Sequence, residues 1–277
     1  MRPDLRELSQ VGRSFPASDL ALWAAGVTFF GLVGIVPAAL VALRLAAALV
    51  GAPAVTEGVD VAINGLPAGH GTPSALRTLT ATAVGLSWGQ LLVALFPATL
   101  YGEGLRRGFT QLAPGGGGRF TGWRGRIGLL PALAAGPLLV LGLLGAAPYV
   151  APLYAAGGGR LLLGVVVAFH VVWVVVSTGL VLVYGLVAAD RIAPKPLLLA
   201  GFGTGAVLSG FLQGFLLFLA IPVEWSLPFG GLPIFGAVTA LALWLYLLHL
   251  LVLVGFRVAL VLDGRASRVG AATATDA

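Results

Sequence analysis

Residues 161–187 read LLLGVVVAFHVVWVVVSTGLVLVYGLV, and they contain no Asp, Glu, Lys or Arg. A helix crosses a bilayer with about 20 consecutive apolar residues, so this run predicts one membrane span. Because the apolar residues are continuous rather than alternating with polar ones, the run does not indicate strands of a transmembrane barrel. Runs of the same kind recur on both sides of it.

Six such runs predict an all-α membrane protein with a bundle of about six transmembrane helices. Their expected bounds are 20–43, 79–101, 127–150, 161–187, 197–221 and 235–256. A single transmembrane domain therefore covers 19–263, and its longest connection is the loop at 51–77. Residues 1–18 predict a short N-terminal amphipathic helix at the membrane interface, with a frayed end as the alternative. The small and polar residues 264–277 predict a disordered cytoplasmic tail.

The composition excludes a soluble globular fold. Of the 277 residues, 58% are hydrophobic and 9% are charged, whereas soluble domains carry about 25% charged residues. So few charges do not cover a water-exposed surface, and membrane topology explains the net charge of +6 better than nucleic acid does. The chain has no cysteine, which excludes disulfides and thiolate metal sites.

The positions of the basic residues predict the orientation, because Lys and Arg are enriched on the cytoplasmic side of spans. With the N-terminus inside, 13 of the 16 basic residues fall on the cytoplasmic side. Those 13 are Arg2, Arg6, Arg13, Arg106, Arg107, Arg119, Arg124, Arg126, Arg191, Lys195, Arg257, Arg265 and Arg268. Only Arg44, Arg77 and Arg160 fall outside. We therefore expect a multi-pass protein of the bacterial cytoplasmic (plasma) membrane with both termini in the cytoplasm.

Several stretches resemble the YihY/BrkB family of bacterial inner-membrane proteins, formerly mislabelled ribonuclease BN. They are 24–37; Tyr184-Gly185-Leu186 with Ala193-Pro194 and the glycine-rich 199–210; and Phe229-Gly230-Gly231 with Leu243-Trp244-Leu245-Tyr246 and Leu253-Val254-Gly255. The resemblance covers about 15–262. It implies a six-span inner-membrane protein without an established activity, spoken of as a virulence factor and as a possible transporter. Two positions depart from the family pattern: Gly255 is followed by Phe256-Arg257 instead of Ala-Glu, and Gly34 replaces a small hydroxyl residue.

Three polar residues form the candidate site. Gln90, His170 and His249 each lie near the middle of a predicted span, at 1.5 Å per residue from its end. Ionisable residues at this depth indicate a function by default, and together the three would mark a polar path or a proton relay. The alternative is that each imidazole stays neutral and hydrogen-bonds a neighbouring helix.

Other polar residues have simpler explanations. Glu103 with Arg106 and Arg107 falls within one helical turn, which predicts a local ion pair. Arg44 and Arg257 lie near span ends, where their side chains are expected to reach the headgroups.

Glycines at four-residue spacing predict close helix contacts, since packing rather than hydrophobicity joins helices in a membrane. The candidates are Gly85, Gly89, Gly201, Gly205, Gly210 and Gly214. The alternative is a smooth face that lines a lipid or substrate groove.

These features favour a transporter or lipid-handling protein whose substrate stays open. A non-transporting membrane scaffold or interaction protein is the alternative. An enzyme such as a membrane ribonuclease is not expected, because RNA hydrolysis needs a metal cluster or an acid–base pair. We expect no cofactor and no metal. The expected partners are the lipid bilayer and anionic lipids rather than nucleic acid.

Overall fold

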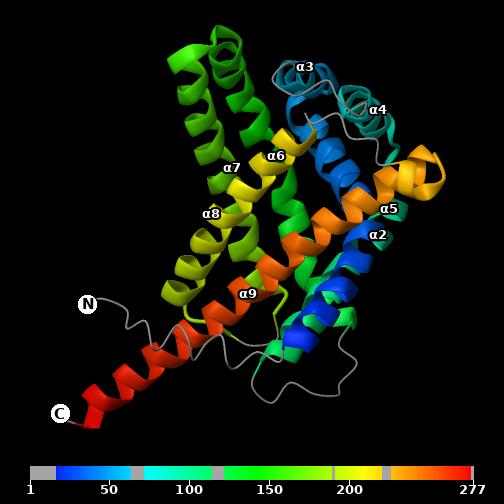
Figure 1. Cartoon of the computed structure of the whole chain (residues 1–277). Helices are drawn as coiled ribbons and strands as arrows, with labels where there is room; N and C mark the ends of the chain where they lie inside the picture. The colour runs from blue at the N-terminus through cyan, green and yellow to red at the C-terminus, as the bar shows by residue number, and fades with distance from the viewer. Residues whose placement is uncertain (1–16, 64–71, 114–121, 189–190, 220–225, 276–277) are drawn as a thin grey trace.

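The computed structural model of the chain describes residues 17–63, 72–113, 122–188, 191–219 and 226–275. Within these ranges the chain is helical apart from short connections. The helices are α2 Ala17–Val50, α3 Ala52–Ile63, α4 Thr72–Gly85, α5 Trp88–Leu112, α6 Gly122–Ala156, α7 Gly158–Leu186, α8 Pro194–Leu219, the 3-10 turn η2 Leu227–Phe229 and α9 Pro233–Thr275 (Figure 1). Residues 1–16 of the amphipathic helix expected at 1–18 lie outside the described residues.

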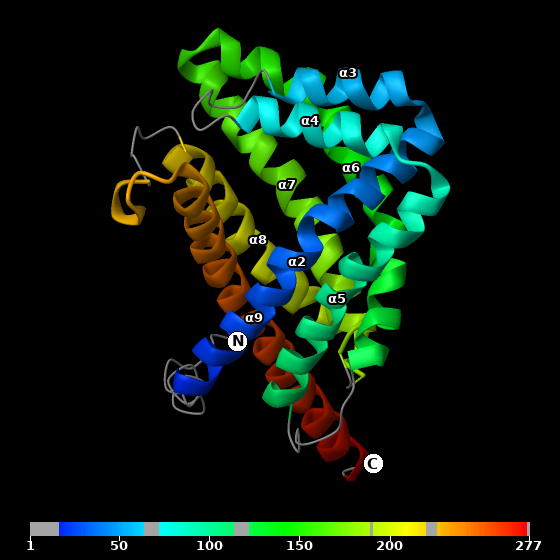
Figure 2. The same ribbon diagram turned by 90° about the vertical axis from the view of Figure 1, so that its right-hand side faces the viewer.

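The long helices run between two ends of the molecule. At one end α3 and α4 lie as a hairpin across the bundle (Figure 2), and we call it the hairpin end. At the opposite end lie the start of α2, the end of α5, the start of α6, the end of α7, the start of α8 and the end of α9. Most of the described arginines belong to segments at that end, which we call the basic end.

The number of spans agrees with about six. Among the described helices, five are long and apolar enough to cross a membrane by length and composition: α2, α6, α7, α8 and α9. We assign α5 as the sixth, because its 25 residues extend about 37 Å at 1.5 Å per residue. Charged residues in its second half lower its hydropathy. The protein is therefore an all-helical, multi-pass membrane protein.

The second span differs from the predicted 79–101. The chain leaves α4 after Gly85 and begins α5 at Trp88, where Ser87 and Gln90 form a capping box. Such a box starts a new helix by satisfying the first unpaired backbone N–H groups. The span is therefore shifted toward Leu112, and much of the expected 51–77 loop is the helical hairpin α3–α4.

The end of the chain also differs from the prediction. The backbone of α9 continues as a helix to Thr275, whereas 264–277 was expected to be disordered. The extension contains no proline and is rich in alanine, which has the highest helix propensity. A polar composition therefore did not end the helix.

Two clusters of buried apolar side chains hold the bundle together. The larger cluster lies toward the basic end and contains the rings of Phe109, Tyr184 and Phe256, which contact one another. The smaller cluster packs α3 against α2 and α4. Of the most apolar stretch of each helix, 33% is buried in α2 and 39% in α9, but only 11% in α6 and in α7. The α6–α7 pair therefore presents most of its surface to lipid.

The six glycines expected at helix contacts divide into two groups. A Cβ on Gly201 would lie 2.5 Å from Val181 Cγ2, and one on Gly205 would overlap the side chain of Ser177. Both therefore lie where α8 packs closely on α7. A Cβ on the other four would meet no described atom within 4 Å: Gly85, Gly89, Gly210 and Gly214. The described atoms give those four no packing role. The prediction failed there because a four-residue spacing selects a helix face but not the helix that packs on it.

Candidate functional site

A buried polar triad joins three helices in the packed side of the bundle. His249 on α9 is 3% exposed. Its Nδ1 lies 3.0 Å from Thr28 Oγ1 on α2, and its Nε2 lies 3.0 Å from the hydroxyl of Tyr101 on α5. The triad is defined by these three residues.

The hydrogen bonds of the triad determine which atoms donate. The hydroxyl of Thr28 donates to the carbonyl of Ala24 at 2.8 Å, so its one proton is already used. Thr28 therefore accepts from Nδ1–H of His249, and Nε2 accepts from the hydroxyl of Tyr101. In this arrangement the imidazole carries one proton and both ring nitrogens are satisfied. That is the alternative in which the histidine cross-links neighbouring helices.

A single glycine makes room for the imidazole. A Cβ on Gly31 of α2 would lie 2.8 Å from His249 Cε1, closer than side-chain carbons approach. The ring of Tyr101 contacts the imidazole edge-on at 5.6 Å between centroids. The triad is therefore a tightly fitted contact between α2, α5 and α9.

The other two predicted site residues lie elsewhere. Gln90 is exposed at the start of α5, where its side chain accepts from the backbone N–H of Ser87 at 2.9 Å. His170 is exposed on α7, with Nδ1 2.7 Å from the carbonyl of Val166. The polar cluster expected from Gln90, His170 and His249 is thus not formed. Depth along a predicted span does not tell which face of a helix a residue occupies.

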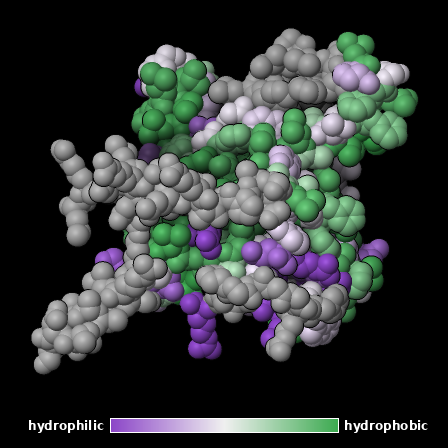
Figure 3. Space-filling model, turned by 60° about the horizontal axis from the view of Figure 1, so that its bottom comes forward, coloured by the Kyte–Doolittle hydropathy of each residue, from purple (hydrophilic) through white to green (hydrophobic). Residues whose placement is uncertain are grey.

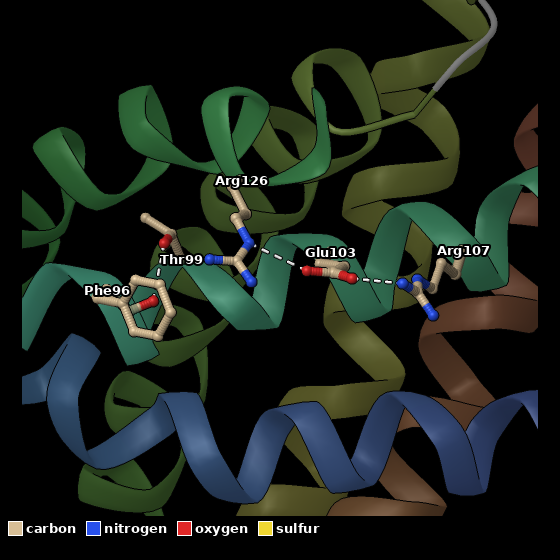
Figure 4. Close-up of polar contacts among 5 residues, drawn as sticks. All are labelled: Phe96, Thr99, Glu103, Arg107 and Arg126. Atoms are coloured by element: carbon tan, nitrogen blue, oxygen red, sulfur yellow. Dashed lines mark hydrogen bonds and ion pairs between the residues drawn. The ribbon is translucent and has the colours of Figure 1, made fainter. Parts of the chain in front are cut away.

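An ion-pair cluster lies between α5 and α6, and Figure 4 draws its members. Its members are Glu103 and Arg107 of α5 and Arg126 of α6. The Glu103 carboxylate is 8% exposed and binds Arg107 through one oxygen and Arg126 Nε at 3.0 Å through the other. The local pair of Glu103 with Arg107 agrees with the sequence prediction, and Arg126 joins it from the next helix.

Glycines allow α6 to approach this carboxylate. A Cβ on Gly102 would lie 2.7 Å from Leu129 Cβ and would overlap the backbone of Gly125. A Cβ on Gly122 would lie 2.5 Å from the carboxyl carbon of Glu103. The start of α6 therefore packs directly on α5. These contacts were not predicted from the sequence.

Aromatic rings accompany both arginines of the cluster. The guanidinium carbon of Arg126 lies 4.9 Å from the ring centre of Phe96, and that of Arg107 lies 5.7 Å from Phe30. Such cation–π contacts add attraction where water is scarce. Phe96 is 64% exposed and stands on the lipid-facing side of α5.

Two further arginines bind the carboxyl ends of helices. Arg106 donates to the carbonyls of Val187 and Ala188 at the end of α7, and Arg257 donates to the carbonyl of Leu112 at the end of α5. Cations at this position satisfy unpaired carbonyls and the helix dipole. Arg106 therefore joins α5 to the end of α7, and Arg257 joins α9 to the end of α5.

An apolar groove opens between α3, α6 and α7 in the half of the bundle near the hairpin end. It has a volume of about 250 Å³. Its lining residues are Ala62, Leu143, Ala146, Ala147, Val150, Ala151, Tyr154, Ala168, Val171 and Val172. Among these, only Tyr154 carries a polar side-chain atom. The nearby surface of α3 is acidic, and Asp60 there pairs with Arg77 at 2.8 Å.

The basic end carries the polar surface of the molecule. Seen from that end, hydrophilic side chains gather around an otherwise hydrophobic surface (Figure 3). Arg124, Arg191 and Lys195 are exposed in segments at that end. The molecule therefore combines an apolar groove near one end with a cationic surface at the other.

The comparisons with known proteins identify one family. The family model described as virulence factor BrkB matches residues 11–276. No curated protein and no solved structure matches the chain.

Proposed function

The chain belongs to the virulence factor BrkB family of membrane proteins, and we propose that it handles lipids or transports a lipid-like substrate in the bacterial cytoplasmic membrane. The basic end then faces the cytoplasm, as the enrichment of Lys and Arg there supports. Both termini lie on that side in this proposal. The proposal assigns the chain no catalytic role.

The apolar groove between α3, α6 and α7 is the observation that carries the proposal. A polar substrate would leave its hydrogen-bonding groups unsatisfied against such walls, which costs about 1–3 kcal/mol per group. An acyl chain has no such groups. Pockets for drug-sized ligands hold about 300–1,000 Å³, so a groove of about 250 Å³ suits one flexible chain. Because α6 and α7 are mostly exposed, a lipid has lateral access.

The scaffold alternative also uses the groove, but with a protein instead of a lipid as its occupant. A scaffold needs a surface for another protein, and the groove would then be filled by side chains of that partner. The two readings differ in whether lipid enters the groove in a membrane that contains only this protein. Reconstituted protein therefore separates them.

We expect a photo-crosslinkable phospholipid with a diazirine on its acyl chain to label the groove in proteoliposomes. Ala168→Phe fills the groove and should reduce labelling of the groove-lining residues of α6 and α7 about tenfold, equivalent to 1.4 kcal/mol. Ala134→Phe is the matched control, since Ala134 is an exposed alanine of α6 outside the groove lining. Labelled peptides are identified by mass spectrometry. Equal labelling in both variants would contradict the lipid proposal and leave the scaffold reading.

Transfer of lipid between leaflets tests the handling step. A fluorescent phospholipid should move between the leaflets of the proteoliposomes faster with the wild-type protein than with Ala168→Phe. If the groove is labelled but no transfer occurs, the protein binds lipid without moving it.

A further inference from the structure

We infer that Arg126 and the ion-pair cluster around it bind the phosphate of an anionic phospholipid in the leaflet at the basic end. The inference rests on the proposed function in that it names a lipid class. Its observations are separate, because they lie at the opposite end of the bundle from the groove.

The first observation is an excess of positive charge at the cluster. Among the described residues, the carboxylate of Glu103 pairs with two guanidinium groups, those of Arg107 and Arg126. The exposed Arg124 precedes Arg126 by two residues. The start of α6 at Gly122 adds the positive end of a helix dipole beside the same carboxylate. One more negative group is therefore favoured at this position.

The second observation is the donor geometry of Arg126. Its Nε is the nitrogen that binds Glu103, and within the described part of the chain its two Nη groups have no hydrogen bond. Its side chain is 21% exposed, so those donors are partly accessible. A guanidinium suits the oxygens of a phosphate, which it binds through two parallel N–H groups. The ring of Phe96 contacts the guanidinium group, with its centre 4.9 Å from the guanidinium carbon.

The third observation selects a lipid over a free phosphate. On α6, Trp123, Ile127 and Leu130 are exposed at helical spacing, with Trp123 at 68%. They form one apolar stripe that runs from the first turn of α6 toward the hairpin end. A tryptophan at the start of such a stripe is typical of the headgroup level of a membrane.

The facing helix continues this surface. On α5, Leu92, Val93 and Phe96 are exposed and large, and α5 packs against α6. Arg126 thus lies where the exposed apolar stripes of α5 and α6 meet the charged residues of the basic end. A headgroup at the guanidinium would place its acyl chains along the stripes, whereas a free phosphate would use none of this apolar surface.

The test compares lipid binding by native mass spectrometry. Purified protein is offered phosphatidylglycerol and phosphatidylcholine in equal amounts. Arg126→Gln removes the charge and the fork while Glu103 keeps Arg107. We expect the preference for phosphatidylglycerol to fall about tenfold, or 1.4 kcal/mol. Arg126→Lys should lose part of the preference, because an ammonium lacks the planar fork.

Arg191→Gln is the matched control, since Arg191 is an exposed arginine at the same end. It should change the preference less than about twofold, as expected for one exposed charge. An equal loss in Arg126→Gln and Arg191→Gln would show general attraction to the basic end and overturn the inference. Displacement of the lipid by millimolar inorganic phosphate would show a free-phosphate site and also overturn it.

Two outcomes separate this inference from the proposed function. If Arg126→Gln leaves the phosphatidylglycerol preference unchanged while the groove is still labelled, the headgroup site is wrong and lipid handling stands. If the preference depends on Arg126 but the groove is not labelled, the headgroup site stands and the groove-based proposal is wrong. Should Arg126→Gln fold poorly, Phe96→Leu, which removes the stacking ring and keeps the charge, should lower the same preference.

Discussion

The α2–α5–α9 side and the α6–α7 pair differ in whether polar side chains are buried and whether apolar surface is covered. On the first side, a buried histidine is hydrogen-bonded to a buried threonine and a partly buried tyrosine. On the second, His170 is exposed, and a groove lined almost entirely by apolar side chains remains open. Since the hydrogen bonds of the triad are satisfied within the packed bundle, we assign the first region stability. The second has unfilled surface next to lipid, and we assign it the function.

The largest effect is expected for Gly31→Leu. The first carbon of the new side chain would already overlap the imidazole of His249, so the leucine must displace the ring and break the triad. Overpacking and the lost hydrogen bonds should together cost about 4 kcal/mol of stability. The measurement is the fraction of protein that remains monodisperse after heating in detergent. Gly26→Leu is the control in the same helix, because a Cβ there meets nothing within 4 Å.

Substitution of the two histidines in the helices compares the stability of the two regions directly. His249→Ala removes two hydrogen bonds and leaves a cavity between three helices, which should cost about 3 kcal/mol. His170→Ala removes an exposed side chain and should change stability by less than about 0.5 kcal/mol. Unfolding midpoints in the same detergent compare them directly. Equal midpoints for the two variants would contradict the assignment of stability to the triad.

A smaller loss is expected for Tyr101→Phe, which keeps the ring and removes one hydroxyl. Hydrogen bonds between membrane helices contribute about 0.6 kcal/mol on average and up to about 1.7. We expect a cost within this range, because Nε2 of His249 then lacks its donor. Thr28→Val removes the other partner, and the double variant should cost less than the sum of the two if the imidazole acts as one unit. An additive double variant would indicate that the two bonds are independent.

The sequence predicted the membrane class and most spans, because α7, α8 and α9 are long apolar runs interrupted by single polar residues. It misplaced the second span, since the charges of Glu103 and Arg107 lie inside α5 where hydropathy indicates a loop. It also missed the α3–α4 hairpin, which is helical but too short to span.

The candidate site was predicted less well, and the reason is distance along the chain. His249 was identified from its depth, but its partners Thr28 and Tyr101 lie 221 and 148 residues away. No local spacing encodes such contacts. Similarly, the four-residue spacing identified Gly201 and Gly205 but equally favoured Gly85 and Gly89, where an added Cβ would meet no described atom within 4 Å.

The smallest effect on stability is expected for Ala168→Phe, the variant that fills the groove. The added ring enters space between α3, α6 and α7 that is open, so it should displace no packed side chain. We therefore expect an unfolding midpoint equal to that of the wild type, within about 0.5 kcal/mol. Since the same variant should lose most acyl-chain labelling, stability and lipid binding would separate in one protein. A large loss of stability would instead mean that the groove belongs to the packed core, and the contrast between the two regions would then be wrong.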